Sequence, residues 1–203
     1  MATKQSKVRR KLFLIRHGQY VHEPTDDKRI LTELGRKQAE CTGNRLAELG
    51  VKFSDVVIST MTRARETGDI ILEQIPDALE PDHTITRTDI LVEGSPIEAI
   101  PRIRFKPDQY EFEDGPRIEA AFRRFFHRAH YDQTTPSHEV IVCHANVIRY
   151  FVCRATQNPP EGWLRMSLAN GSITEVVIEP DGQVYVMGVG DKGHLPTDMI
   201  TFN

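Results

Sequence analysis

The chain has 203 residues, a formal net charge of −3 at pH 7, 39% hydrophobic residues and 27% charged residues. This length and composition are typical of one soluble globular domain with a substantial core. The small negative charge gives no bulk attraction to nucleic acid or to a membrane surface, so an anion site would need a local cluster of positive side chains. No apolar run approaches transmembrane length. We therefore predict no nucleic-acid partner and no membrane segment in this chain.

Two apolar runs, each followed by a helical pattern, open the chain. Residues 12–15 predict a short buried strand, which ends at Arg16-His17-Gly18. A helix is expected from its cap at Thr32 to Gly50, then a second strand over 55–58 and a helix from about Met61 to Pro76. This β-α-β-α order predicts a parallel sheet with right-handed crossovers.

The periodicity fades between Pro76 and Pro116. Five prolines occur from Pro81 to Pro116, and we expect this stretch to be an ordered functional loop or lid. A helix is predicted to open at Asp114-Gly115-Pro116 and to continue to Ala129. Four arginines on its outer face are interpreted as a solvated surface: Arg117, Arg123, Arg124 and Arg128.

The last part of the chain returns to strands. Residues 138–143 predict a third buried strand, followed by His144 and an apolar helix through 147–152. Residues 173–179 and 183–189 alternate around a Pro-Asp-Gly turn, which predicts an antiparallel hairpin. The expected fold is α/β: a three-layer, doubly wound, mostly parallel sheet with helices on both faces and this C-terminal hairpin at an edge. We divide the chain into a basic flexible arm (1–10), a catalytic domain (11–190) and a tail (191–203).

Three predicted strand ends share a cationic or proton-carrying character. They are Arg16-His17-Gly18, Ser59 leading to Arg63, and His144-Ala145-Asn146. The carboxyl ends of neighbouring strands converge on one crevice in a doubly wound sheet. Arg63 and Asn146 would lie in the first turns of helices, where free N–H groups favour an anion. We therefore predict an anion site, with phosphate as the commonest ligand.

Each of these residues also has a simpler interpretation. Arg16 and His17 could solvate a strand terminus, Arg63 could be a surface residue paired with Glu66, and His144 could be a hydrogen-bonded core histidine. The recurrence of the same residue types at three strand ends is what favours a site.

Four segments carry a family resemblance. Leu-Ile-Arg-His-Gly at 14–18, Ser-Thr-Met-Thr-Arg-Ala-Arg-Glu-Thr at 59–67, Leu-Val-Glu-Gly at 91–94 and Cys-His-Ala-Asn-Val-Ile-Arg-Tyr at 143–150 resemble the phosphoglycerate mutase branch of the histidine phosphatase superfamily. Further stretches at 93–98, 113–122 and 159–165 are similar to the mitochondrial serine/threonine-protein phosphatases of that branch. The resemblance implies a metal-independent serine/threonine-protein phosphatase that needs no cofactor.

The resemblance also implies roles for eight residues. The expected catalytic residues are His17, Arg16, Arg63, Glu93 and His144, and the expected substrate-binding residues are Gly18, Ser59 and Asn146. His17 would attack phosphorus and form a phosphohistidine, while Glu93 would protonate the leaving alkoxide and then activate water. Arg16 and Arg63 would hold the non-bridging oxygens, and His144 would add positive charge. No metal ligands are expected.

Two departures keep other functions open. Many members of the superfamily carry an asparagine six residues after the nucleophile, where this chain has Glu23, and the longer mutase insertion is missing after Glu93. One alternative is a phosphoglycerate mutase or small-molecule phosphatase on the same scaffold. The other is a catalytically silent adaptor.

Expectations about partners and location follow from the resemblance. The substrates would be phosphoserine and phosphothreonine proteins, and the chain would form a homodimer or a higher homo-oligomer. The location would be mitochondrial, membrane-associated if a longer amino terminus exists, or cytoplasmic if this chain is the full length. The tail is expected to pack on a neighbouring subunit or near the mouth of the site.

Overall fold

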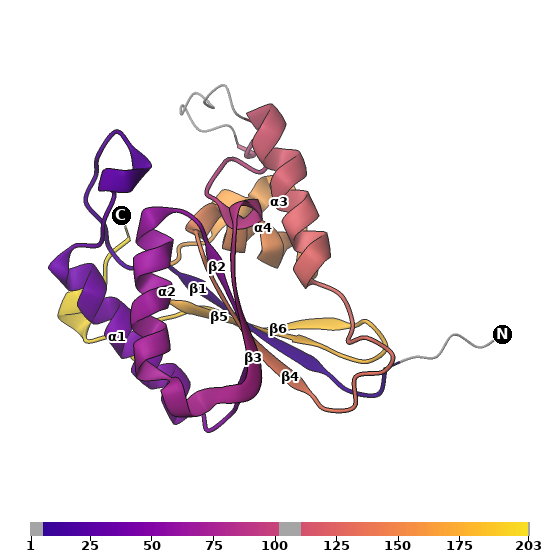
Figure 1. Cartoon of the computed structure of the whole chain (residues 1–203). Coiled ribbons are helices and arrows are strands. Elements are labelled where there is room, and N and C mark those ends of the chain that lie inside the picture. The colour runs from indigo at the N-terminus through magenta and orange to yellow at the C-terminus, as the bar shows by residue number, and fades with distance from the viewer. Residues whose placement is uncertain (1–5, 102–110, 203) are drawn as a thin grey trace.

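The computed structural model describes residues 6–101 and 111–202 and contains one six-stranded sheet flanked by helices (Figure 1). The strands are β1 (Arg10–Arg16), β2 (Phe53–Ser59), β3 (Leu79–Thr88), β4 (Ser137–Cys143), β5 (Ile173–Ile178) and β6 (Val184–Asp191). The long helices are α1 (Glu33–Glu48), α2 (Thr62–Gln74), α3 (Glu111–Phe125) and α4 (Ala145–Ala155). Short 3-10 turns that bear on the site are η1 (Asp26–Lys28) and η3 (Asp89–Leu91).

The sheet has the strand order β3-β2-β4-β1-β5-β6. β1 and β4, β4 and β2, and β2 and β3 pair in parallel, whereas β5 pairs antiparallel with both β1 and β6. The mostly parallel sheet with an antiparallel hairpin at one edge is therefore confirmed. None of the helices in residues 6–101 and 111–202 is long and apolar enough to cross a membrane.

Alternate residues of β1 point into two separate cores, which produces the three layers. Phe13 and Ile15 pack with residues of α1 and α2 on one face of the sheet. Leu12 and Leu14 pack with residues of α3 and α4 on the other. Because both faces are covered, the central strands are apolar runs rather than alternating ones, and this is why they were recognisable in the sequence.

The helix boundaries were predicted closely for α1 and less well for α3. The Thr32 side chain accepts a hydrogen bond from the Gly35 N–H (3.0 Å), and Gly50 follows the helix with φ 66°. α3 begins at Glu111, before the predicted start, and it contains Pro116. The prediction placed Pro116 in the first turn, because the backbone N–H groups of that turn have no partner within the helix and proline lacks this group. The helix in fact begins about one turn earlier.

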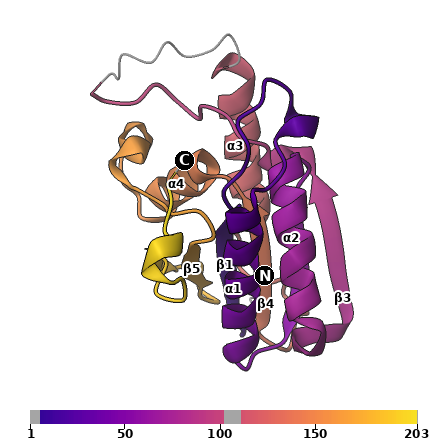
Figure 2. The same ribbon diagram turned by 90° about the vertical axis from the view of Figure 1, so that its left-hand side faces the viewer.

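Two further predictions are corrected. The stretch expected to be a loop contains β3, an edge strand next to β2 in which no residue is fully buried, so it shows no apolar run (Figure 2). Part of that loop, residues 102–110, lies outside the described residues, as do residues 1–5 of the arm. Arg10 belongs to β1 rather than to the arm: it is buried, and its guanidinium binds both carboxylate oxygens of Glu139.

Candidate active site

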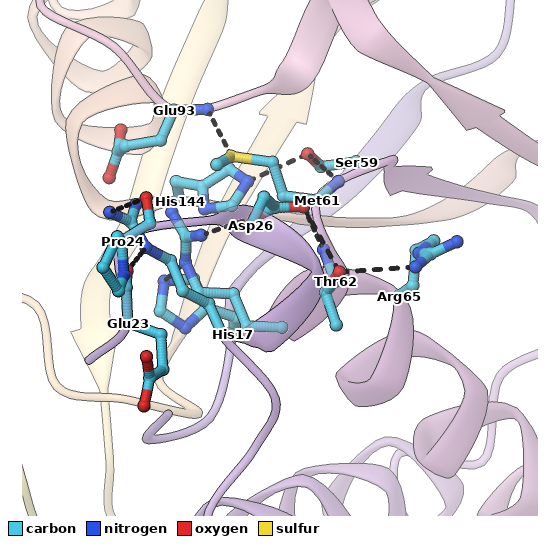
Figure 3. Close-up of polar contacts among 12 residues, drawn as sticks. His17, Glu23, Pro24, Asp26, Ser59, Met61, Thr62, Arg65, Glu93 and His144 are labelled. Carbon is cyan, nitrogen blue, oxygen red and sulfur yellow. Dashed lines mark hydrogen bonds and ion pairs between the residues drawn. The ribbon is translucent and has the colours of Figure 1, made fainter. Parts of the chain in front are cut away.

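The structure brings the five expected catalytic residues together beyond the carboxyl ends of adjacent strands, where their charges act on one another. Figure 3 shows three of them, His17, Glu93 and His144. Arg16 ends β1 and is followed by His17, while His144 follows β4. Arg63 lies in the first turn of α2, directly after β2, and Glu93 follows η3. Since β2, β4 and β1 are neighbours, residues more than a hundred positions apart in the chain meet in one place.

His17 is held in one tautomer, with the lone pair of its Nε2 directed at Arg63. Its Nδ1 lies 2.7 Å from the carbonyl oxygen of Gly18, so Nδ1 carries the proton and donates it there. Its Nε2 is 3.2 Å from the Arg63 Nε–H, which donates to it. Burial, followed by the charges of Arg63 and Arg16, holds the pKa of His17 well below its ordinary value. The imidazole is therefore neutral at neutral pH, and Nε2 is available as a nucleophile.

Arg16 and Arg63 supply two buried positive charges, with exposed fractions of 6% and 3%. Burial lowers the pKa of Arg16 to about 10 and also lowers that of Arg63, so both remain cationic at neutral pH. Arg16 Nη1 donates to the Leu168 carbonyl oxygen (2.5 Å). Glu93 acts on both guanidinium groups as a nearby negative charge, and Asp26 pairs with Arg63 at 3.3 Å. Buried positive charge of this kind favours an anionic ligand such as phosphate.

His144 lies beside His17, with the two ring centroids 5.1 Å apart. Its Nε2 is 2.9 Å from the Ser59 hydroxyl, which fixes the ring. Burial and the neighbouring His17, Arg63 and Arg16 hold the pKa of His144 well below its ordinary value. Among the described residues its buried Nδ1 has no hydrogen-bond partner. The interpretation of His144 as a hydrogen-bonded core histidine accounts for only one of its two nitrogens.

Glu93 is the acidic group of the cluster. Burial raises its pKa, while Arg63, the Gly94 N–H, Arg16 and the Asn146 N–H oppose this shift. The balance favours the protonated carboxyl more than in water, which is the property a proton donor needs. A bound phosphate dianion would raise the pKa of Glu93 further, because like charges disfavour ionisation.

The three residues expected to bind substrate have supporting contacts within the chain. A Cβ on Gly18 would come within 2.4 Å of the Gly35 carbonyl oxygen, so the glycine allows the strand end to approach α1. Ser59 orients His144. Asn146 donates from Nδ2 to the Gly94 carbonyl oxygen (3.1 Å) and so supports the segment that carries Glu93. Direct contact of these residues with substrate stays a prediction.

Asp26 contacts the cluster, although no pattern in the sequence indicated it. One carboxylate oxygen accepts hydrogen bonds from the N–H and the hydroxyl of Thr62, and the other pairs with Arg63 Nη1 at 3.3 Å. The suggested Arg63–Glu66 pair is therefore wrong, because Glu66 binds Arg36 and the Leu31 N–H instead. Nothing in the local pattern of the polar loop distinguished Asp26 from its acidic neighbour Asp27.

Replacing Asp26 with alanine is expected to lower the Tm by roughly 2–4 °C, since losing a helix cap costs about 1 kcal/mol. Asp26→Asn keeps an oxygen acceptor and should retain most of the Tm. Asp27→Ala, an exposed neighbour in η1, is the matched control and should change little. Equal Tm values for the two alanine variants in a thermal melt would contradict the capping role.

Two other residues that the sequence analysis left unassigned lie at the cluster. The Tyr20 ring stacks against the Arg63 guanidinium (4.7 Å) and lies edge-on to His17. Arg149 of α4 donates to the Asn146 side-chain oxygen, and its charge interacts with those of Glu93 and Arg16. Arg149 was present in the quoted 143–150 motif, so its position in the first turns of α4 could have indicated it.

Glu23 and the C-terminal tail lie close to the site but outside the cluster of catalytic residues. The Arg29 side chain donates to the Glu23 carbonyl oxygen, and the Glu23 carboxylate is directed away from Glu93 (Figure 3). The tail folds back beside α1, where the Gln38 amide donates to the Met199 carbonyl oxygen and the Thr201 hydroxyl. Arg16 Nη1 also donates to the Phe202 carbonyl oxygen at 3.3 Å. The tail thus reaches a residue of the site within its own chain.

The described residues contain no group of three or more histidine, cysteine, aspartate or glutamate side chains that could hold a metal ion. The three cysteines are free thiols. The positive charges described at the site are those of the Arg16 and Arg63 guanidinium groups.

Comparisons with known proteins agree with this geometry. The family model described as "Histidine phosphatase superfamily (branch 1)" matches residues 12–189. The protein named "Serine/threonine-protein phosphatase PGAM5, mitochondrial" from Xenopus laevis is 53% identical over 197 residues, which cover 96% of this chain and 70% of that protein. Its counterpart from Homo sapiens is 53% identical over 200 residues, with coverages of 97% and 68%.

A solved structure shows the same architecture. The phosphoglycerate mutase from Plasmodium falciparum superposes with a TM-score of 0.64 at 29% sequence identity, covering 97% of this chain and 99% of that one. The mutase thus shares the fold over the whole of its own length.

Proposed function

Because the chain belongs to branch 1 of the histidine phosphatase superfamily, we propose that it is a serine/threonine-protein phosphatase that acts through a phosphohistidine on His17. The arrangement of His17 carries the proposal. Its Nδ1 is occupied by the Gly18 carbonyl oxygen, and its Nε2 faces the Arg63 side chain. A phosphoryl group bound by Arg63 would therefore lie next to a neutral nucleophilic nitrogen.

In the first step Nε2 of His17 attacks phosphorus, the N–P bond forms and the bond to the seryl or threonyl oxygen breaks. Arg16 and Arg63 bind the non-bridging oxygens as charge develops on them. The leaving oxygen is a poor leaving group, so it takes the proton of Glu93 as the bond breaks. The products of this step are the dephosphorylated side chain, the phosphohistidine and the Glu93 carboxylate.

In the second step water attacks phosphorus from the side that the leaving group vacated. The Glu93 carboxylate accepts a proton from the water, the N–P bond breaks, and inorganic phosphate leaves. Glu93 is then protonated and His17 is neutral again, so the cycle closes. The charge of Arg16, Arg63 and a protonated His144 would serve both steps, and for this reason no metal ion is included in the proposal.

The substrate class is inferred from the similar proteins. Relatives at 53% identity over nearly the whole chain are named serine/threonine-protein phosphatases. The solved phosphoglycerate mutase, at 29% identity, supports a second candidate on the same scaffold. A silent adaptor is less consistent with a site in which all five expected catalytic side chains are present and adjacent.

Steady-state kinetics on phosphoserine and phosphothreonine peptides, beside isomerisation of 3-phosphoglycerate, test the function. We expect hydrolysis of the peptides to exceed any mutase activity, and EDTA to leave the rate unchanged because arginine and histidine supply the charge. Mutase activity without peptide hydrolysis would favour the second candidate. Loss of activity in EDTA with recovery on Mg²⁺ or Mn²⁺ would show that the charge source is misassigned.

A homo-oligomer and a mitochondrial location complete the proposal. β6 is the last strand of the sheet, so its outer backbone groups could pair with a second chain. Its exposed Tyr185 and Met187 would enlarge such a contact. The mitochondrial location rests on the names of the relatives.

A further inference from the structure

Glu93 lies on a segment without regular secondary structure that is held by side chains from α3, from α4 and from the residue just before α2. The segment follows η3, and Val92, which is extended, joins it to Glu93. A carboxyl group that must meet a leaving oxygen needs a fixed position. The contacts that fix this segment therefore bear on the chemistry.

Arg117 of α3 makes the largest share of these contacts. Its Nη1 donates to the carbonyl oxygens of Val92 (2.6 Å) and Ile90 (3.3 Å), and its Nη2 donates to the Glu93 carbonyl oxygen (3.3 Å). Arg117 was interpreted in the sequence as part of a solvated face. That interpretation is wrong, because its side chain is only 21% exposed and binds three backbone carbonyl oxygens at and before Glu93.

Asp114 completes the arrangement one helical turn earlier. Its Oδ1 accepts from Arg117 Nη2 at 2.6 Å, and its Oδ2 accepts from the Ser95 N–H at 3.1 Å. A Cβ on Gly94 would lie 2.3 Å from this carboxylate. Glycine between Glu93 and Ser95 therefore allows the backbone to lie this close to Asp114. The Arg117–Asp114 pair therefore binds the segment on both sides of Glu93.

Two other elements support the same segment. Asn146 at the start of α4 donates to the Gly94 carbonyl oxygen (3.1 Å). The Glu93 N–H points to the sulfur of Met61, which precedes α2, at 3.3 Å (Figure 3). The backbone of Glu93 is thus held from α2, α3 and α4, while its side chain faces Arg16 and Arg63.

We propose that Arg117, oriented by Asp114, is a positioning residue that places the Glu93 carboxyl for proton transfer to the leaving oxygen. This inference rests on the proposed function, since it concerns the same reaction. Arg117 acts through the backbone of residues 90–93, and its side chain is not assigned a contact with substrate. Its loss should therefore matter most in the steps in which Glu93 moves a proton, and less through the distant effect of its charge on His144.

The test compares two substrates that differ in their need for an acid. A phosphoserine peptide has a poor leaving group, whereas 2,4-dinitrophenyl phosphate releases a stable anion without protonation. Arg117→Met is expected to lower kcat on the peptide by about 100-fold, as expected for a displaced catalytic group. In the same variant the burst of dinitrophenolate, which reports the first step alone, should slow by less than about threefold, and Arg117→Lys should recover part of the peptide rate.

Arg123→Met is the matched control on the same helix. The Arg123 side chain is 75% exposed and pairs with Glu119 four residues earlier, away from Glu93. It should behave as wild type on both substrates. A thermal melt of each variant shows whether Arg117→Met remains folded.

A double-mutant cycle excludes a general structural effect. The Arg117→Met/Glu93→Gln protein should hydrolyse the peptide no more slowly than Glu93→Gln alone, because Arg117 has no acid left to place. A further loss in the double variant, or a dinitrophenolate burst slowed in Arg117→Met as much as the peptide rate, would overturn the inference. If the proposed function is wrong, the wild-type protein will be inactive on the peptide. In that case an alkyl phosphomonoester that the wild type does hydrolyse replaces the peptide in the comparison with dinitrophenyl phosphate.

Discussion

The His17→Ala protein is expected to hydrolyse a phosphoserine peptide at least about 10³-fold more slowly than the wild type, because the attacking nitrogen is gone. Neither neighbour can replace it. His144 Nε2 is engaged with the Ser59 hydroxyl, its Nδ1 is fully buried, and Arg63 is cationic. Since the nucleophile is needed for every phosphomonoester, the loss should be as large on dinitrophenyl phosphate. The measurement is kcat on both substrates.

His127→Ala serves as the control for this variant, because His127 is exposed and lies far along the chain from the cluster. Its rate should match that of the wild type. A rapid-quench experiment with the wild type should also trap an acid-labile, base-stable phosphoenzyme, absent from His17→Ala. A His17→Ala protein with a near-normal rate, or a phosphoryl group found on another residue, would refute the mechanism.

Strands that are buried on both faces could be predicted from the sequence, and the exposed edge strand could not. β1, β2 and β4 are covered by helices on both faces, so their sequences are continuous apolar runs that stand out. β3 is an edge strand with partly exposed positions throughout and a proline at residue 81, and nothing local distinguishes it from a loop. The start of α3 was placed late because Pro116 gave a stronger local signal than the residues before it.

The sequence predicted those site residues whose positions are set by the topology of the sheet. Arg16, His17, Arg63 and His144 all follow buried strands, so their convergence follows from the parallel order alone. Glu93 follows an edge strand and a short turn, and only the family resemblance indicated it. Asp26 and Arg117 could not be found locally, since their partners lie 36 and about 25 residues away in the chain.

The charges explain why the resting site is suited to phosphate. Two buried guanidinium groups lie close to two histidines that they help to keep neutral. A phosphate dianion would reverse the effect on His144, because a nearby negative charge raises the pKa of a histidine. Protonation of His144 would then add positive charge near the transition state once the substrate is bound. His17 would stay neutral and act as the nucleophile.

The Glu93→Gln protein is expected to lose about 10²- to 10⁴-fold in kcat on a phosphoserine peptide, the usual range for removal of a general acid. Glutamine keeps the size of the side chain and cannot supply the proton. On dinitrophenyl phosphate the first step needs no acid, so the burst of dinitrophenolate should remain near the wild-type rate. Glu98→Gln, an exposed carboxyl on the same segment, is the control and should leave both rates unchanged. Equal losses on the two substrates would contradict the assignment of Glu93 as the acid.

The pH dependence gives a second, independent test of Glu93. It acts in its protonated form, and burial raises its pKa, so the wild-type rate on the peptide should fall as the pH rises through that value. His17 must be neutral, and its pKa is lowered, so the rate should fall on the acid side only well below the ordinary range of histidine. Glu93→Gln should therefore lose the alkaline limb of the kcat profile and keep the acid limb. An alkaline limb that persists in this variant would mean that another group delivers the proton.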